Sequence, residues 1–234
     1  MAQLRSFHLV LFGAVLVVGG SLTGCSLAAE KNAQRTYTVD GKVTAVSATT
    51  HGGNIEIVPI AAGGTVKVTE KYTYNEEKPS PAHAFKDGRL TLKAEECTGS
   101  GRQCAVSYRV LLPRNASVDL HTSGGNITVR GTSGAISAQT SGGNITVADS
   151  TARRAKVKTS GGDLDLALAS EPDEVSAQTS GGDVTIRVPK GSYAVDASTS
   201  GGTRTVSVPT DKGSAHKISA RTSGGDVSVE YAKP

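Results

Sequence analysis

One tetrapeptide, Thr-Ser-Gly-Gly, occurs six times in the second half of this 234-residue chain and constrains its fold more than any other feature. The copies recur at intervals of 18 to 23 residues, and each is followed by Asn, Asp or Thr. They open at Thr122, Thr140, Thr159, Thr179, Thr199 and Thr222. A period close to twenty residues is typical of solenoids, in which each repeat forms one coil that stacks on the next.

Apolar residues alternate with polar residues on both sides of each corner. The residues four and two positions before the threonine are apolar in every copy, as at Val118 and Leu120. After the glycines the alternation resumes, as at Ile127 and Val129. A period of two is the pattern of a strand with one buried face. We therefore predict an all-β fold, a β-solenoid of strand, corner and strand, with a flat antiparallel sandwich as the alternative.

The corner residues have a predicted structural role in such a stack. Equivalent strands of successive coils are expected to pair in parallel, about 4.8 Å apart. The glycines are expected to supply a positive φ for a sharp turn, and the Asn or Asp to bond the backbone of the turn. The threonine methyl can pack inward while its hydroxyl bonds the turn.

One copy departs from the pattern. In "TSGGTRTV", Arg204 stands where the other copies have Ile, Leu or Val. We expect a local distortion near that corner, with the strand slipped or the arginine reaching out to solvent. The longest interval, before Thr222, predicts a longer loop around Pro209–Ala215.

The N-terminus has the pattern of a secretory signal. Arg5 precedes an apolar run from Leu9 to Val18, and Leu22-Thr23-Gly24-Cys25 follows, which resembles a bacterial lipobox. We predict a signal peptide over residues 1–24, lipidation at Cys25 and a tether over 25–34, so that acyl chains hold the protein on the membrane. An ordinary signal peptide with an accidental cysteine is the alternative.

Residues 35–121 are predicted to form an N-terminal β half that caps the column, and residues 122–234 the repeat solenoid. The first half contains one related corner in "VSATTHGGNIEIV" at Val46–Val58. Cys97 and Cys104 frame a Gly-containing turn, so export to an oxidising compartment predicts a disulfide between them, with two free thiols as the alternative.

The segment "CAVSYRVLLPRNASVDLHTSGGNITV" at Cys104–Val129, with Pro113 and Asn115 at the strand junction, and the five later corners carry a family resemblance. The chain resembles the DUF4097 family of candidate bacterial adhesins over most of Val46 to Val229. The resemblance implies a right-handed, β-helix-like surface domain without established catalytic residues.

Side chains at polar positions after the corners form the best candidate for a ligand face. Stacking is expected to bring Asp163, Asp165 and Asp183 together on neighbouring rungs, where Ca²⁺ could hold them. Lys156 and Lys158 lie close by in the sequence. The alternative is that Asx and Thr side chains only stabilise turns and edges. No firm metal site and no cofactor are predicted.

The function that these patterns favour is a lipid-anchored, extracytoplasmic binding or scaffold protein without catalysis, on the outer side of a bacterial cell membrane. Its expected partner is an envelope polymer or an envelope protein. Nucleic acid is excluded, because the basic residues are scattered and Trp is absent. The alternatives are a polysaccharide lyase or hydrolase using the acidic face, and an envelope-stress sensor lipoprotein.

Overall fold

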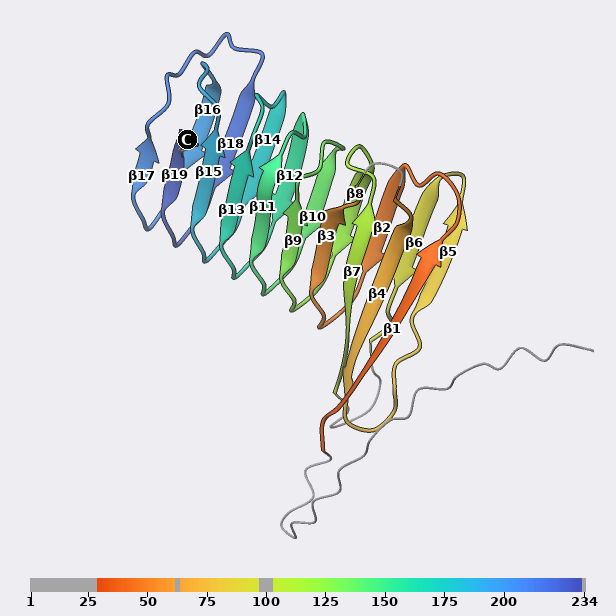
Figure 1. Cartoon of the computed structure of the whole chain (residues 1–234). Coiled ribbons are helices and arrows are strands. Elements are labelled where there is room, and N and C mark those ends of the chain that lie inside the picture. The colour runs from red at the N-terminus through yellow and green to blue at the C-terminus, as the bar shows by residue number, and fades with distance from the viewer. Residues whose placement is uncertain (1–28, 62–63, 97–102, 233–234) are drawn as a thin grey trace, which may run out of the picture.

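The protein is a two-sheet column of stacked coils, as the computed structural model shows for residues 29–61, 64–96 and 103–232 (Figure 1). Within these ranges, no helix is long and apolar enough to cross a membrane. All the described strands belong to two sheets, here named sheet A and sheet B, which face each other across one hydrophobic core. The all-β solenoid architecture predicted from the repeats is therefore confirmed.

Sheet A has ten strands and sheet B has nine. In spatial order, sheet A consists of β1 (Lys31–Val39), β4 (Val66–Tyr74), β7 (Cys104–Leu112), β3 (Ile55–Pro59), β9 (Ile127–Arg130), β11 (Ile145–Ser150), β13 (Leu164–Leu168), β15 (Val184–Val188), β19 (Val227–Tyr231) and β17 (Arg204–Val206). In spatial order, sheet B consists of β16 (Ala194–Ser198), β18 (Lys217–Arg221), β14 (Glu174–Gln178), β12 (Arg154–Lys158), β10 (Ile136–Gln139), β8 (Ser117–His121), β2 (Ala45–Thr49), β6 (Arg89–Lys93) and β5 (Ala82–Lys86).

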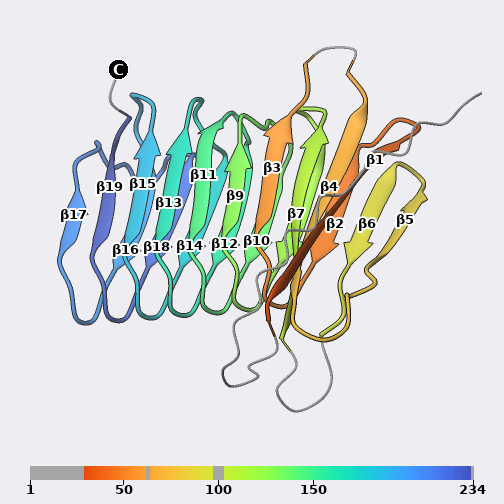
Figure 2. The ribbon, with the colours of Figure 1, turned by 60° about the horizontal axis from the view of Figure 1, so that its bottom comes forward.

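Each coil runs up one strand of sheet B, turns at a corner and returns along one strand of sheet A. The corners lie in a row along one side of the column (Figure 2). Each coil is named here by its corner threonine. The coils are Thr50 (β2, β3), Thr122 (β8, β9), Thr140 (β10, β11), Thr159 (β12, β13), Thr179 (β14, β15), Thr199 (β16, β17) and Thr222 (β18, β19).

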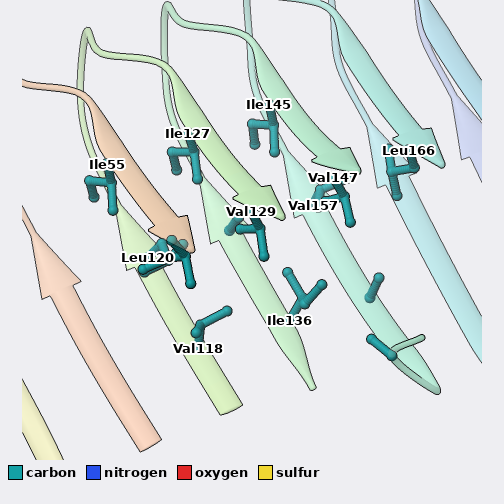
Figure 3. Packing of buried hydrophobic residues seen from close by; sticks show 14 of the residues in the cluster. Ile55, Val118, Leu120, Ile127, Val129, Ile136, Ile145, Val147, Val157 and Leu166 are labelled. Carbon is teal, nitrogen blue, oxygen red and sulfur yellow. The ribbon is translucent and has the colours of Figure 1, made fainter. Parts of the chain in front are cut away.

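The core consists of the inward-facing residue rows that the alternation predicts. Ile55, Ile127 and Ile145 pair in register along sheet A and are fully buried (Figure 3). Leu120 and Ala138 occupy the facing row of sheet B. Each large side chain buried in this way contributes roughly 1.5–3 kcal/mol, so the stack of coils is stable through its shared core.

The coils do not stack in the order of the chain. The Thr222 coil lies between the Thr179 coil and the Thr199 coil, because β18 pairs with both β14 and β16, and β19 pairs with both β15 and β17. The expectation that each coil pairs with its successor is therefore wrong at this end. Residues 207–216, the connection predicted to be long, carry the chain back past the end coil.

Arg204 gives the physical reason for this order. It pairs in register with Val227, at the end of the row of buried apolar side chains. Inside the column its guanidinium would be buried without a partner, at a large cost. At the end it is exposed and donates from Nε to the Ala197 carbonyl oxygen, at 2.8 Å. The Thr199 corner keeps its usual bonds, and the change appears in β17, which has three residues.

The opposite end is covered by strands of the N-terminal half. The Thr50 coil stacks directly on the Thr122 coil, and β6 and β7 stack on its other side. Antiparallel β4 and β1 extend sheet A, and antiparallel β5 extends sheet B. The N-terminal half thus caps the column, as the sequence predicts, and shares its core. Cys97 lies outside the described residues, so the disulfide between Cys97 and Cys104 stays a prediction.

Candidate functional site: the corner ladder and the outer faces

The corner threonines bind each coil to its neighbour. The Thr140 hydroxyl donates to the Gly125 carbonyl oxygen of the adjacent coil at 2.9 Å and accepts the Gly143 N–H of its own corner at 3.3 Å. The same donation recurs at every corner of the repeat, with oxygen–oxygen distances of 2.7 to 2.9 Å. One hydroxyl therefore satisfies two backbone groups, and the row of corners is held at a fixed spacing.

The residue after the second glycine forms a second ladder. The side-chain Oδ1 of Asn126 accepts the backbone N–H of Asn144 at 2.8 Å, and each Asn or Asp in the row repeats this contact with the next coil. The accepting side chains are Asn54, Asn126, Asn144, Asp163, Asp183 and Asp226. Thr203 ends the ladder, because its coil is the last in the column and has no further coil to bind.

Close approach of the neighbouring backbone explains the second glycine of each corner. The corner glycines do not take the expected positive φ, which the described residues show only at other positions. A Cβ built on Gly143 would lie 2.0 Å from the Gly125 carbonyl oxygen, whereas one built on Gly142 would be no nearer than 3.8 Å to its neighbours. The first glycine of the pair has room for a side chain, and the second has none.

The three aspartates of the predicted cation face have different partners in the structure. Asp163 and Asp183 lie on consecutive rungs of the corner ladder, where each Oδ1 accepts a backbone N–H. Asp165 instead lies on the outer face of sheet A and pairs with Arg187 at 2.6 Å, and Arg187 also contacts Glu230 at 3.1 Å. Among the described residues no group of three or more His, Cys, Asp or Glu could hold a metal ion. Calcium binding here stays a prediction, and the geometry favours the structural role.

No histidine ring of the described residues is hydrogen-bonded to a serine or threonine hydroxyl, although His51, Glu96, Cys104 and Ser123 line a common hollow of about 470 Å³. His51 lies 3.9 Å from Glu96, His121 lies 3.1 Å from Asp119, and these pairs are on the surface. A second hollow, of about 570 Å³ on sheet A, is lined by Asp149, Arg187 and Glu230 with Leu168 and three alanines, and contains no histidine, serine or cysteine. Lys156 and Lys158 are on sheet B and Asp165 is on sheet A, so the basic groups expected beside the acids point away from Asp165.

The cap contains a buried carboxyl group that the sequence analysis did not identify. Glu70 is fully buried on β4 and accepts hydrogen bonds from the hydroxyls of Tyr37, at 2.9 Å, and Tyr72. Burial and the bond to Glu70 raise the pKa of Tyr72 to about 12. Burial raises the pKa of Tyr108 above its ordinary value, and its hydroxyl has no hydrogen-bond partner among the described residues. This cluster fixes β1 against β4.

The outer face of sheet B carries exposed basic residues that the sequence analysis did not identify as a surface. On β12, Arg154, Lys156 and Lys158 alternate with the buried Ala155 and Val157, so all three basic side chains lie on the outer face. Their neighbours on adjacent strands could have been predicted from the repeats. Residues that lie the same number of positions before their corner threonines pair across neighbouring strands.

Comparison with known proteins gives one family and several distant structures. The family model described as Toastrack DUF4097 matches residues 40–230. No curated protein matches the chain. A candidate cell adhesion protein from Clostridium sporogenes is 13% identical, with 86% of this chain and 100% of that chain covered and a TM-score of 0.47. A candidate adhesin from Bacteroides fragilis is 17% identical, with 88% and 99% covered and a TM-score of 0.48. A candidate adhesin from Parabacteroides merdae is 15% identical, with 87% and 97% covered and a TM-score of 0.38.

Proposed function

We propose that this chain, which belongs to the Toastrack DUF4097 family, is a lipid-anchored, extracytoplasmic binding scaffold that performs no catalysis. The observation that carries the proposal is the corner ladder, which fixes every coil to the next and leaves two polar outer faces. Such a surface has the regular spacing of sheet strands, about 4.8 Å, over the length of the column. It is suited to holding an extended partner, whereas catalysis needs a few groups that converge.

The proposed anchor is a lipid on Cys25, after removal of residues 1–24. These residues lie outside the described ranges, and the support comes from the order of Arg5, the apolar run and the lipobox-like Leu22–Cys25. The strand β1 begins at Lys31, six residues after Cys25. A chain of six residues spans at most about 20 Å, so a lipidated protein would hold its cap close to the bilayer.

The anchor is tested by expressing the chain and its Cys25→Ser variant in a bacterial host. We expect the chain to incorporate an alkyne-tagged fatty acid, to fractionate with membranes and to be digested by protease added to cells whose outer layers are opened. The variant should lose the label and leave the membrane fraction. An unlabelled wild-type chain, or a variant that fractionates as the wild type does, would contradict the anchor.

Binding and the absence of catalysis are tested together with isolated envelope fragments. The Cys25→Ser chain is expected to sediment with the fragments saturably and to release no new reducing ends or unsaturated sugars from them. Lack of sedimentation would refute the scaffold, and release of sugar products would establish the enzyme alternative instead.

A further inference from the structure

The strand β12 presents three positive charges in succession on one side of the column. Arg154, Lys156 and Lys158 are all exposed, and the residues between them are buried. Side chains two residues apart on a strand lie about 7 Å apart, so neighbouring charges repel each other.

The strands on either side do not neutralise the two lysines. Lys156 pairs in register with Ser137 on β10 and Ser176 on β14. Lys158 pairs with Gln139 and Gln178 in the same way. These four neighbours are uncharged and can hydrogen-bond, so they surround the ammonium groups with polar contacts and leave their charges uncompensated.

The carboxylates of the same face are committed to other partners or lie beside other cations. Asp119 contacts His121 at 3.1 Å, and Asp196 contacts Arg221. Glu174 lies in register between Arg154 on β12 and Lys217 on β18. The charge of Lys156 and Lys158 is thus available to a ligand.

The face also lacks the apolar groups that a lipid core or a hydrophobic protein partner would require. Among the described residues, Phe85 is the exposed large hydrophobic side chain, and it lies on β5 at the cap end of the column. A flat, hydrated, positively charged sheet instead fits an extended and hydrated anion.

We propose that the outer face of sheet B, centred on Lys156 and Lys158, binds a linear anionic polysaccharide. Cationic groups spaced by about 7 Å along β12 present a row of positive charge to the acidic groups of an extended polymer. Gln139 and Gln178 donate and accept hydrogen bonds with the sugar hydroxyls. This inference rests on the proposed binding function and names its ligand class.

The experiment measures binding of the full chain, purified in nonionic detergent, to polygalacturonate, which carries one carboxylate per sugar. The test variant is Lys156→Gln/Lys158→Gln. The matched control is Lys67→Gln/Lys71→Gln, which removes the same charge from exposed positions on β4 of sheet A. Neutral dextran and vesicles of phosphatidylglycerol are the comparison ligands.

The chain should bind polygalacturonate and should show no binding to dextran. The test variant should bind about thirtyfold more weakly, since each of the two lysines contributes about 1 kcal/mol near an anionic surface and every 1.4 kcal/mol is tenfold. The control should stay within about twofold, and salt should weaken wild-type binding more steeply than test-variant binding.

Equal losses in the two variants would overturn the proposal, because net charge and not this face would then govern binding. A lysine-dependent affinity for the vesicles without affinity for the polymer would assign the face to lipid headgroups and would also overturn it. If the chain does not bind polygalacturonate but sediments with envelope fragments, this inference is wrong and the proposed scaffold function stands.

Discussion

The second glycine of each corner provides a sharp test of how the coils are held together. Gly143→Ala and Gly142→Ala add the same methyl group to adjacent residues of one corner. The added Cβ at residue 143 would lie 2.0 Å from the Gly125 oxygen and 2.5 Å from the Gly125 carbonyl carbon. At residue 142 the nearest atom is the Ser123 oxygen, at 3.8 Å, which is an ordinary contact.

The contacts at the corner determine how much the two variants should differ in their free energy of unfolding. To reach a normal contact, the two corners must separate by more than about 1 Å, which is enough to break the hydrogen bonds that join them. Those at risk include Thr140 Oγ1 to the Gly125 oxygen, the Asn144 N–H to Asn126 Oδ1, and the Gly142 N–H to the Ser123 oxygen. At about 1 kcal/mol each, their loss lowers the free energy of unfolding by about 3 kcal/mol for Gly143→Ala. Gly142→Ala should change it by less than about 1 kcal/mol.

Urea unfolding followed by far-ultraviolet circular dichroism measures this difference. With a denaturant slope of about 2–3 kcal/mol/M, the midpoint of Gly143→Ala should fall by about 1 M, at an unchanged slope. The pair Gly162→Ala and Gly161→Ala repeats the comparison one coil further along, where the corresponding distances are 2.1 and 3.8 Å. Equal destabilisation by both members of a pair would refute the close-approach explanation.

Three further predictions follow from the ladder, the column end and the cap. Asp183→Asn keeps an acceptor for the Asp226 N–H and should leave the unfolding free energy within about 0.5 kcal/mol, whereas Asp183→Ala should lower it by about 1 kcal/mol; equal urea midpoints would contradict this. Arg204→Val gives the end coil an interior-like face, so sedimentation velocity should show association that grows with concentration; a single unchanged species would contradict this. The pKa of Tyr72 is raised to about 12 in the folded state, from about 10 in the unfolded chain. Its contribution to the free energy of unfolding is therefore full below about pH 10 and is lost as pH rises through the folded pKa. The midpoint temperature of thermal unfolding of Tyr72→Phe should decline less steeply over that pH range than that of the wild type, and an identical decline would contradict this.

The sequence predicted the repeat unit and the buried face of each strand, because both depend on local alternation. Ile127, Ile145 and Leu164 follow the two-residue period that any strand with one buried face requires, and the fixed corner aligns them. The early corner at His51 could also be placed in the same column, since its flanking Val46 and Ile55 keep that register.

The order of the last two coils was missed, although the sequence contains its signal. An interior coil needs an apolar residue in the core row and a side-chain acceptor for the next coil. Arg204 replaces the apolar residue, and Thr203 replaces the Asn or Asp acceptor. Taken together they mark the end of a column. The prediction of a local distortion at Arg204 overlooked that its coil has a neighbouring coil on one side only.

The reason for the glycines could not be predicted from the sequence, because a corner glycine fits a positive φ as well as a close backbone contact. Only the distance between Gly143 and the adjacent Gly125 oxygen separates the two explanations. The buried Glu70 was hidden for a related reason. Its partners Tyr37 and Tyr72 lie on the inward rows of antiparallel strands. These strands lie outside the repeats, so the sequence does not show how they pair.

Lysine footprinting tests most directly the claim that the outer face of sheet B is the binding surface. The full chain is treated with an amine-acetylating reagent, alone and saturated with polygalacturonate, and each lysine is quantified by mass spectrometry. The polymer should protect Lys156 and Lys158 and leave Lys67 and Lys71 as reactive as before. Protection of the sheet A lysines with no change at Lys156 and Lys158 would contradict it.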